Sequence, residues 1–456
     1  MSSFHLINFG CRASHADGAA IKKQLLVKGF NEAGPESSEV AVLNTCTVTA
    51  AADAEVRQVI RRIHRANPQC KIVVTGCYAQ RSADEIARLP GVTWVIGNSH
   101  KHTLVNILTG DAGTVGTTTT GDAPVEAGHG EPPFSSDVES DAAQPVVLVG
   151  EIGDTFHFAP VFGDDRTRPT LKVQDGCNAR CSFCVIPHVR GQSRSMDPGK
   201  VIEQVCELEQ NGYKEIVLSG INLGSYGRDL DRRINFLGLV ERILRETAIP
   251  RLRISSIEPM DVSRELIELV ATEPRMAHHF HVPLQSGSNR ILRMMNRRYW
   301  TAQYAERILA IRERMHNCGI GADVMAGFPD ESEADHAESL RFIESLPFTY
   351  LHIFPYSARP GTPAAESAEQ LDGRRIHERV GDLKSLIAAK RDRFLNAQIG
   401  KNLSAVVLHK TQDEAPTALS SNYLQILLPG TEVIANTMLE VSVGRVHGNG
   451  LVGRAA

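Results

Sequence analysis

Apolar and polar positions alternate between two periods along the first hundred residues. Short runs rich in β-branched residues predict strands over residues 4–10, 40–46, 71–77 and 93–98. A helical period separates the second and third runs, over residues 52–66. Strands that alternate with helices favour a parallel sheet with right-handed crossovers. We therefore expect a parallel α/β domain of flavodoxin-like type over residues 1–108.

A second alternating region follows in the middle of the chain. Its strand candidates lie at residues 171–174, 215–219, 251–256, 279–284, 321–327 and 350–355. Helical patterns separate them, at 198–211, 261–271, 302–317 and 332–345, and a further helix is expected over 374–397. Six such units in one run predict a partial (β/α)6 barrel of TIM-like type over residues 166–398.

The two remaining stretches differ in pattern from these domains. Residues 399–456 carry short β runs with Gly and Asn turns, which predicts a small all-β barrel. Residues 109–165 are rich in Thr, Gly, Pro and acidic residues and show no period. We expect them to form an acidic flexible linker or insertion.

Composition narrows the class of protein. The chain has 456 residues, of which 42% are hydrophobic and 22% charged, values typical of a soluble globular protein. It has no apolar run of about 18–20 residues, and no basic region precedes the first apolar stretch. We expect a cytoplasmic protein that does not bind a membrane.

The net charge of −4 conceals an uneven distribution. Residues 102–165 contain eleven Asp and Glu and no Lys or Arg, so the rest of the chain carries 49 basic and 42 acidic residues, or +7. This balance permits a polyanionic partner but does not require one.

Three of the nine cysteines stand close together in "DGCNARCSFC", at positions 177, 181 and 184. They follow the first expected barrel strand, on the face where such barrels keep their chemistry. A zinc site completed by a distant His and unrelated buried cysteines are the alternatives. An iron–sulfur cluster is favoured, and three thiolates would leave one of four irons open to a small molecule.

Cys11, Cys46 and Cys77 are far apart in sequence, yet each ends an expected strand of the N-terminal domain. In a parallel sheet those ends share one edge, where open α/β sheets bind ligands. Cys70 precedes its strand, so we expect it at the opposite edge. Any one of the three could be a buried structural cysteine, but their common position favours a second metal site.

Other polar positions also end expected barrel strands. Gln285, Ser286 and Asp323 lie where the barrel mouth begins, and we expect cofactor or substrate contacts there, with simple loop hydrogen bonds as the alternative. His279 and His281 share a strand face and His278 points away, and no HExxH accompanies them, so a zinc site is disfavoured. Residues 290–314 hold seven Arg with two aromatics near the middle, which suits either RNA or a solvated helix.

The segment with the three close cysteines resembles the signature of the radical S-adenosylmethionine (SAM) enzymes. A domain with three scattered cysteines, this barrel and a terminal β module (the TRAM domain) together resemble the radical SAM methylthiotransferase family, over nearly all of the chain except the insertion. The resemblance implies two 4Fe–4S clusters, a SAM-binding one on Cys177, Cys181 and Cys184 and an auxiliary one on Cys11, Cys46 and Cys77. It also implies that Phe183 lies near the SAM adenine and that Ser219 and Gly220, in "SGINLGSYG", lie near its amino group.

Three further motifs refine the resemblance. "NTCTVT" (44–49), "DGCNARCSFCVIPHVRG" and "HVPLQSGSNRILRMMNRRY" are similar to the MtaB type. This type acts on carbon 2 of N6-threonylcarbamoyladenosine next to the anticodon of tRNA. It implies that one SAM methylates a sulfur on the auxiliary cluster and that a second gives the radical that activates the base. The implied partners are the tRNA anticodon loop and an electron donor protein, and we expect a monomer.

Other functions remain open at this stage. A sibling enzyme would act on isopentenyladenosine in tRNA or on a ribosomal-protein aspartate. A cobalamin-dependent radical enzyme would show DxHxxG in its N-terminal domain, which "SHADGAA" does not supply. A non-catalytic iron–sulfur protein that senses iron and binds RNA would need neither SAM nor an open iron.

Overall fold

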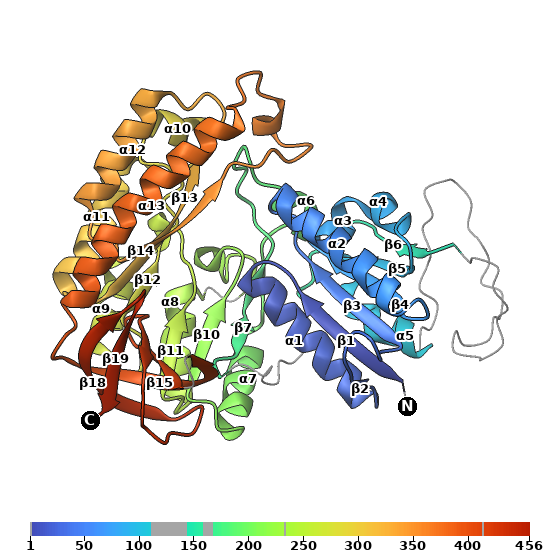
Figure 1. Cartoon of the computed structure of the whole chain (residues 1–456), viewed down its shortest axis with the longest axis horizontal. Helices are drawn as coiled ribbons and strands as arrows, with labels where there is room; N and C mark the ends of the chain where they lie inside the picture. Colours follow the sequence, from blue (N-terminus) through green and yellow to red (C-terminus); the bar gives the residue numbers. More distant parts are fainter. Residues whose placement is uncertain (1, 111–143, 158–166, 232–233, 413–414) are drawn as a thin grey trace. The chain divides into compact units, whose positions relative to one another are not determined.

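The computed structural model describes residues 2–110, 144–157, 167–231, 234–412 and 415–456 (Figure 1). Most of the expected linker, residues 111–143 and 158–165, lies outside this described part. The chain divides into two compact units. The first takes in residues 1–162, 175–178 and 185–194, and the second takes in 163–174, 179–184 and 195–456. In the described residues, no helix combines the length and the apolar character that a membrane crossing needs.

The first unit is built on a six-stranded parallel sheet in the order β2-β1-β3-β4-β5-β6, which confirms the flavodoxin-like prediction. Its strands are β1 (Ser3–Asn8), β2 (Asn31–Glu32), β3 (Val40–Thr45), β4 (Lys71–Gly76), β5 (Val92–Gly97) and β6 (Val146–Leu148). The last strand lies inside the expected linker. Its residues belong to the β-branched run "VVLV", which pairs with β5 and extends the sheet.

Helices cover both faces of this sheet. The helices of this unit are α1 (Arg12–Val27), α2 (Ala50–Ala66), α3 (Cys77–Arg81), α4 (Ala83–Ala87), η1 (Lys101–Thr103), α5 (Leu104–Thr109) and α6 (Ile186–Arg190), of which α6 packs against α3. Val40 and Val42 of β3 pack with residues of α1 and α5, whereas Ala41 and Leu43 pack with α2. Burial on both faces explains why β3 is a continuous apolar run rather than an alternating one.

The second unit contains the six expected barrel strands, as two parallel sheets in the orders β11-β10-β7 and β12-β13-β14. In the described residues a single bridge, between Leu252 and Met276, joins the two sheets, while β7 and β14 are edge strands that do not pair with each other, so the barrel is incomplete. The strands are β7 (Thr170–Lys172), β10 (Glu215–Ser219), β11 (Arg251–Ile254), β12 (His279–His281), β13 (Gly319–Ala326) and β14 (Tyr350–Pro355). A short pair, β8 (Gln174–Asp175) with β9 (Arg194–Ser195), follows β7.

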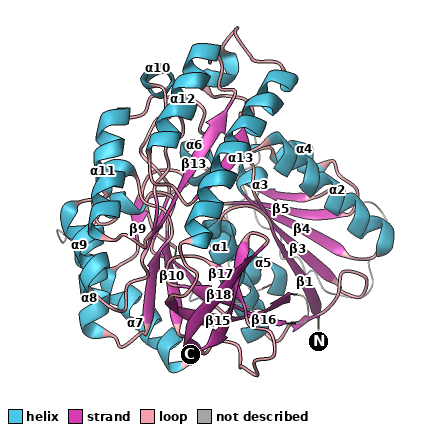
Figure 2. Cartoon of the chain, turned by 60° about the vertical axis from the view of Figure 1, so that its left-hand side comes forward, coloured by secondary structure: helices cyan, strands magenta, loops and turns pink. Residues whose placement is uncertain are grey.

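Helices follow the strands of this partial barrel and lie outside them (Figure 2). They are α7 (Pro198–Gln210), η2 (Leu223–Ser225), α8 (Phe236–Glu246), η3 (Pro259–Asp261), α9 (Arg264–Thr272), α10 (Asn289–Met294), α11 (Thr301–Arg314), α12 (Glu333–Ser345), η4 (Pro363–Glu366) and α13 (Gly373–Asn396). Side chains fix several helix starts: Ser263 caps α9, and Ser332 forms a capping box with Asp335 at the start of α12. The β/α alternation read from the sequence is therefore confirmed.

The tail forms a closed five-stranded barrel in the order β15-β16-β17-β19-β18, as predicted. Its strands are β15 (Asn402–Gln412), β16 (Ala415–Ser420), β17 (Gln425–Leu427), β18 (Met438–His447) and β19 (Gly450–Ala455). The turn after β16 packs against the first residues of the central strands. There the Tyr423 ring lies 4.4 Å from that of His279, and Arg253 donates to the carbonyl of Ser421 at 3.0 Å.

A buried charge cluster anchors this contact. Glu215, at the start of β10, is fully buried and pairs with Arg253 at 2.7 Å, Arg168 at 3.1 Å and Arg251 at 3.6 Å. Burial alone would raise the pKa of Glu215, but the arginines outweigh it and lower this pKa to about 2. The carboxylate is therefore ionised throughout the neutral range and holds three guanidinium groups together.

Candidate functional site

The N-terminal cysteines meet at one edge of the first sheet. Cys11 stands at the start of α1 just after β1, Cys46 directly follows β3, and Cys77 is the first residue of α3 after β4. Because β1, β3 and β4 are neighbours in the sheet, the strand ends bring the three cysteines together as the pattern predicts. Cys70 precedes β4 at the opposite edge, where its sulfur lies 3.8 Å from the Ser38 hydroxyl.

A glycine precedes two of these cysteines and permits the close approach. Gly10 has φ +89°, and a Cβ there would lie 2.6 Å from the sulfur of Cys46. Gly76 has φ +100°, and a Cβ there would lie 2.4 Å from the Thr45 carbonyl oxygen. An L side chain would be strained and would collide at either position. This Gly-Cys pairing is a sequence signal that the pattern analysis missed.

The spacing of these sulfurs argues against a single zinc ion. In the part of the chain that the structure describes, only His281, Asp323 and His352 offer three ligand atoms within 4.8 Å of one another. One ion bonded to three sulfurs at about 2.3 Å would hold them about 3.8 Å apart. The wider separation of the three N-terminal sulfurs fits a cluster, in which each cysteine binds a different iron.

Burial and crowding keep Cys46 as a thiol while no metal is bound. Burial raises the pKa of the Cys46 thiol to about 12, and the nearby Cys77 raises it further. A metal ligand must be a thiolate, so loading of this site has to release a proton. The buried environment therefore makes the thiolate state dependent on the metal.

Arg190, on α6, is the cationic centre of this region. Its guanidinium is 1% exposed and binds Asp175 at 2.9 Å and Asp17 at 3.0 Å. Burial would lower the pKa of Arg190, but Asp175, Cys77 and Asp17 together hold this pKa well above its usual range. The Cys77 sulfur also accepts a hydrogen bond from the Asn98 side chain at 3.5 Å. A fixed positive charge thus lies beside thiols that would become anionic on binding metal.

The second cysteine triplet lies on the loop after β8. Cys177 donates its backbone N–H to the Gly191 carbonyl at 3.0 Å, and Cys184 donates to the Cys181 carbonyl at 3.1 Å. Between them, Ser182 donates its backbone N–H to the carbonyl of Met295 at 3.1 Å and its hydroxyl to that of Met294 at 2.8 Å. These hydrogen bonds to main-chain carbonyls fix the course of the loop that carries the three cysteines.

Arg297 contacts this loop directly. Its guanidinium is 7% exposed, donates to the Cys181 sulfur at 3.4 Å and pairs with the carboxylate of Glu258. The Tyr299 ring lies 5.0 Å from the guanidinium carbon and fixes its plane. Burial opposes the charge, but Tyr299, Glu258 and Cys181 hold the pKa of Arg297 well above its usual range. Burial also raises the pKa of Glu258 in spite of this partner.

Among the predicted cofactor contacts, Gln285 has the clearest mark of a binding residue. It is 8% exposed and adopts φ +67°, a conformation that costs energy for a non-glycine residue. Its side-chain oxygen is buried and has no hydrogen-bond partner in the described residues. A buried acceptor without a partner is costly unless a ligand supplies a donor.

The other predicted contacts are placed less directly. Gly220 follows β10, and a Cβ there would lie 2.8 Å from the Gln174 side-chain oxygen, which also accepts from the Asn222 N–H at 2.7 Å. Phe183 is half-buried and meets Phe328 edge to face. The Ser286 hydroxyl is held inside its own loop, 3.3 Å from that of Ser339, and Ser219 is a buried residue of β10. Their roles toward a cofactor stay predictions.

Asp323 has partners that the sequence analysis did not find. Its Oδ1 lies 3.0 Å from His281 Nε2 and 3.3 Å from His352 Nδ1. Burial alone would raise the pKa of Asp323, but hydrogen bonds from the two imidazoles bring this pKa below its usual range. His279 and His281 do share a strand face, as expected, and both contact the Tyr350 hydroxyl. The polar partner of His281 is on another strand, so no local motif reveals it.

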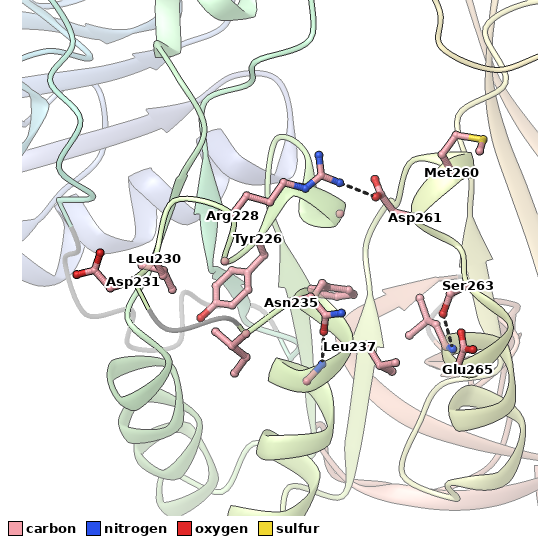
Figure 3. Close-up of a pocket in the computed structure, with 16 residues that line it drawn as sticks. Tyr226, Arg228, Leu230, Asp231, Asn235, Leu237, Met260, Asp261, Ser263 and Glu265 are labelled. Carbon is pink, nitrogen blue, oxygen red and sulfur yellow. Dashed lines mark hydrogen bonds and ion pairs between the residues drawn. The ribbon is translucent and has the colours of Figure 1, made fainter.

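A pocket of about 950 Å³ opens beside the glycine-rich loop (Figure 3). Its lining comes from residues 224–231, 234–238 and 260–266, and Arg228 pairs with Asp261 across its rim at 3.0 Å. None of the predicted site residues lines it. The pocket therefore borders the loop after β10 but is separate from the cysteines and from Gln285.

The arginines of residues 290–314 do not form one basic face. Arg297 pairs with Glu258, Arg290 pairs with Asp335 at 2.6 Å, and Arg314 pairs with Glu268 at 2.7 Å. Trp300 remains 44% exposed, with the Arg293 guanidinium 5.4 Å from its ring. This last pair presents an exposed aromatic ring and a cation together.

Two protein-family models match separate parts of the chain. Residues 3–97 match the model of uncharacterized protein family UPF0004, and residues 171–343 match that of the radical SAM superfamily. Among solved structures, the radical SAM methyltransferase TsrM from Kitasatospora setae, with cobalamin and a 4Fe–4S cluster bound, is similar in fold. Its TM-score is 0.53 at 16% identity, over 80% of this chain and 74% of that chain. The cysteine loop and its barrel thus define a radical SAM enzyme.

Curated relatives narrow this class. The chain is 38% identical to a threonylcarbamoyladenosine tRNA methylthiotransferase MtaB of Aquifex aeolicus over 92% of this chain and 95% of that one. It is 34% identical to the Bacillus subtilis protein of the same name, over 97% and 93%. A tRNA-2-methylthio-N6-dimethylallyladenosine synthase of Natranaerobius thermophilus is 29% identical over 99% and 96%. The chain belongs to the radical SAM methylthiotransferase family, whose members use SAM and two 4Fe–4S clusters.

Proposed function

We propose that this protein adds a methylthio group to carbon 2 of N6-threonylcarbamoyladenosine, next to the anticodon of tRNA. The observation that supports this most is the presence of two separate cysteine triplets, one at a sheet edge and one on the barrel loop. The relatives named for this reaction match over 92% and 97% of the chain. A protein that acts on an anticodon loop also fits the excess of basic residues outside the insertion.

The two triplets have different roles in this proposal. Cys177, Cys181 and Cys184 would hold the cluster that binds SAM, and the other set, Cys11, Cys46 and Cys77, would hold the auxiliary cluster, which would supply the transferred sulfur. When bound, SAM supplies on one-electron reduction a carbon radical strong enough to take hydrogen from an unactivated C–H bond. An electron donor protein provides that electron, and the enzyme acts as a monomer.

The remaining residues bind and orient SAM. Gln285 offers a buried acceptor at the barrel mouth, which suits the amino or ribose donors of SAM. Ser219 and Gly220 bring backbone groups to the amino acid part, Phe183 lies near the adenine, and Ser286 supports the Gln285 loop. These residues position SAM and take no part in proton transfer.

The target base has to leave its stack to reach such a site. A loop nucleotide is unpaired already, so its extrusion costs less than that of a duplex base. Residues 294–296 lie against the cysteine loop, where the Asn296 side chain donates to the Arg180 carbonyl at 2.6 Å. The exposed Trp300 and Arg293 lie just beyond, and an aromatic ring with a cation can stack a flanking base.

The sibling activities are the second candidates. The dimethylallyladenosine enzymes are 27–32% identical over most of the chain, so overall similarity separates the two substrates only slightly. The motif "NTCTVT" around Cys46 favours the threonylcarbamoyl substrate. A ribosomal-protein aspartate and a non-catalytic RNA-binding sensor remain as outcomes of the test.

Nucleoside mass spectrometry of tRNA tests the proposal. We expect cells without the gene to lose 2-methylthio-N6-threonylcarbamoyladenosine, and the wild-type gene, but not a Cys46→Ala variant, to restore it. Loss of the isopentenyl derivative instead would transfer the function to the sibling substrate. Unchanged levels of both nucleosides would overturn a role in tRNA methylthiolation.

A further inference from the structure

A chain of polar side chains crosses the inner face of the second sheet of the barrel. His279 Nε2 lies 2.7 Å from the Tyr350 hydroxyl, which lies 3.0 Å from His281 Nδ1. His281 Nε2 contacts Asp323 Oδ1 at 3.0 Å, and the same oxygen contacts His352 Nδ1 at 3.3 Å. Phe280 and Val282, which alternate with the histidines, are fully buried on the opposite face, toward the helices.

The chain runs from a closed end to an open end. His279 is 2% exposed and His281 is 6% exposed, whereas the side chain of His352 is 59% exposed. With its Nδ1 directed at Asp323, His352 presents Nε2 as its second polar atom. The buried His281 and its partner Asp323 thus fix the orientation of the exposed His352 ring, which a ligand would contact.

We call this chain of polar side chains the polar wall. It faces the same interior of the barrel as the proposed SAM-binding loop. Asp323 is close enough to Glu258 to contribute to the raised pKa of that residue, although burial is the larger cause. Glu258 pairs with Arg297, which donates to the Cys181 sulfur at 3.4 Å. Asp323 also lies beside Gln285, because its backbone carbonyl accepts the Gln285 N–H at 2.8 Å.

We propose that Asp323 and His352, backed by His281, bind the polar substituent on N6 of the target adenine, with His352 Nε2 donating to its carboxylate. This inference rests on the proposed function and names the residues that select its substrate. With Nδ1 at 3.3 Å from Asp323 Oδ1, the His352 ring is oriented so that Nε2 can donate to a carboxylate, and a hydrogen bond to a charged group is stronger than one between neutral groups.

The same wall disfavours an isopentenyl group. A hydrocarbon substituent would displace water from His352 and Asp323 and return no hydrogen bond to either. Sites built to bind a polar group reject analogues that lack it more strongly than apolar sites reject an added group. The wall therefore gives a physical reason for selecting threonylcarbamoyl over isopentenyl.

The test is a competition between two anticodon stem–loops, one with N6-threonylcarbamoyladenosine and one with N6-isopentenyladenosine. The holoenzyme, with both clusters reconstituted, is compared with its His352→Phe and His352→Gln variants. We expect His352→Phe to lower kcat/KM for the threonylcarbamoyl substrate roughly 10- to 100-fold, the range for a hydrogen bond to a charged group. Its kcat/KM for the isopentenyl substrate should stay or rise, and Gln, which keeps a donor, should restore part of the preference.

Asp382→Asn is the matched control for Asp323→Asn. Asp382 also pairs with a histidine, His336 Nε2 at 3.0 Å, but on helices α12 and α13 rather than on the inner strand face. We expect Asp323→Asn to reduce the preference and Asp382→Asn to leave it unchanged.

Three results would overturn the inference. The first is a preference that survives His352→Phe, and the second is an equal loss on both stem–loops. The third is a divalent metal ion, beyond cluster iron, that the wild type retains and His352→Phe loses, because the residues would then be a metal site. If the wild type modifies neither stem–loop, the proposed function fails, and the dissociation constants of both stem–loops for the wild type and His352→Phe still decide the inference.

Discussion

The two cysteine triplets are assembled in opposite ways. Cys11, Cys46 and Cys77 are brought together by the ends of β1, β3 and β4, so the whole sheet has to form before they meet. The other triplet lies within the eight residues 177–184, on one loop. One site is a product of tertiary structure, and the other is mostly a product of local sequence.

Each region also contains an arginine whose side chain is almost inaccessible to solvent, Arg190 in the first and Arg297 in the second, and their partners differ. Arg190 binds two carboxylates, Asp17 and Asp175, and Asp17 pairs with Lys101 as well. Arg297 binds one carboxylate and donates directly to a cysteine sulfur. Their charges are therefore used differently.

Because their partners differ, the guanidinium groups of Arg190 and Arg297 should have different effects. The charge of Arg190 is balanced by carboxylates of its own unit, so its main effect is on the stability of that unit. The charge of Arg297 is shared with the Cys181 sulfur, a proposed cluster ligand, so we expect its main effect to be on the electronic state of whatever that sulfur binds. Each use predicts a different failure when the residue is changed.

Cysteine substitutions should have the largest effects on activity and should distinguish the functions of the two regions. We expect Cys181→Ala to lower SAM cleavage about 10³-fold or more, because the SAM-binding cluster loses a ligand. Cys46→Ala should lower formation of the methylthio product to the same extent while SAM cleavage persists. Iron content measures cluster loading, an assay of 5′-deoxyadenosine measures SAM cleavage, and an assay of the modified nucleoside measures product formation. Cys206→Ser, half-buried on α7, is the control and should keep both activities. Loss of SAM cleavage in Cys46→Ala would show that the two regions are not separable.

The parts of this comparison that the sequence predicted depend on local pattern. The strands, both triplets and the exclusion of Cys70 follow from period and from strand ends, which a sequence displays directly. Arg190 and Arg297 did not stand out, because 173 residues separate Arg190 from Asp17 and 116 separate Arg297 from Cys181. A buried arginine has the same letter as a solvated one, and only the tertiary fold supplies its partners.

Two other misses have equally physical causes. The strand β6 is only three residues long and stands among acidic, Thr-rich sequence, so composition outweighed its short β-branched run. His352 lies on β14, whose residues are all half-buried or exposed and so show no clear alternation of burial. The glycines before Cys11 and Cys77 were visible, and a search for strand-end Gly-Cys pairs could have used them.

Removal of the Arg190 charge tests its structural role. We expect Arg190→Met to destabilise the first unit by about 3–5 kcal/mol, because Asp17 and Asp175 would keep buried charges without their main partner. Denaturant unfolding of the metal-free protein, with hydrogen exchange of α1 and α6, measures the effect. A second change, Asp17→Asn, should recover part of the loss. Arg245→Met is the control, since its pair with Glu246 is exposed and should contribute little to stability. A loss below about 1 kcal/mol for Arg190→Met would contradict a structural role.

At Glu215 one carboxylate pairs with three guanidinium groups, whereas at Arg190 one guanidinium group pairs with two carboxylates. The pKa of Glu215 is lowered to about 2 from 4.5, so its contribution is complete above pH 4.5 and is lost as pH falls toward 2. We expect about 3 kcal/mol of the stability of the second unit to disappear over this window. Unfolding measured from pH 5 down to 2 checks the slope. Glu215→Gln should flatten it and also lower stability at pH 7, and an unchanged slope would count against this ion cluster.

The smallest effect concerns Arg297 and is electronic. Reduction adds negative charge to a cluster, and a guanidinium 3.4 Å from the Cys181 sulfur stabilises that charge. We expect Arg297→Gln to lower the midpoint potential of the SAM-binding cluster by about 60 mV, a tenfold change for a one-electron couple. Redox titration followed by electron paramagnetic resonance measures it, in a Cys46→Ala background that leaves one cluster.

Arg293→Gln is the matched control for this substitution. Arg293 is an exposed residue of α10, four positions before Arg297, and its partner is the Trp300 ring rather than a sulfur. Its loss should leave the midpoint potential unchanged. If both substitutions shift the potential equally, the effect is one of general surface charge, and Arg297 has no special relation to Cys181. If neither shifts it, Arg297 is a structural residue like Arg190, and the two regions do not differ in the way proposed.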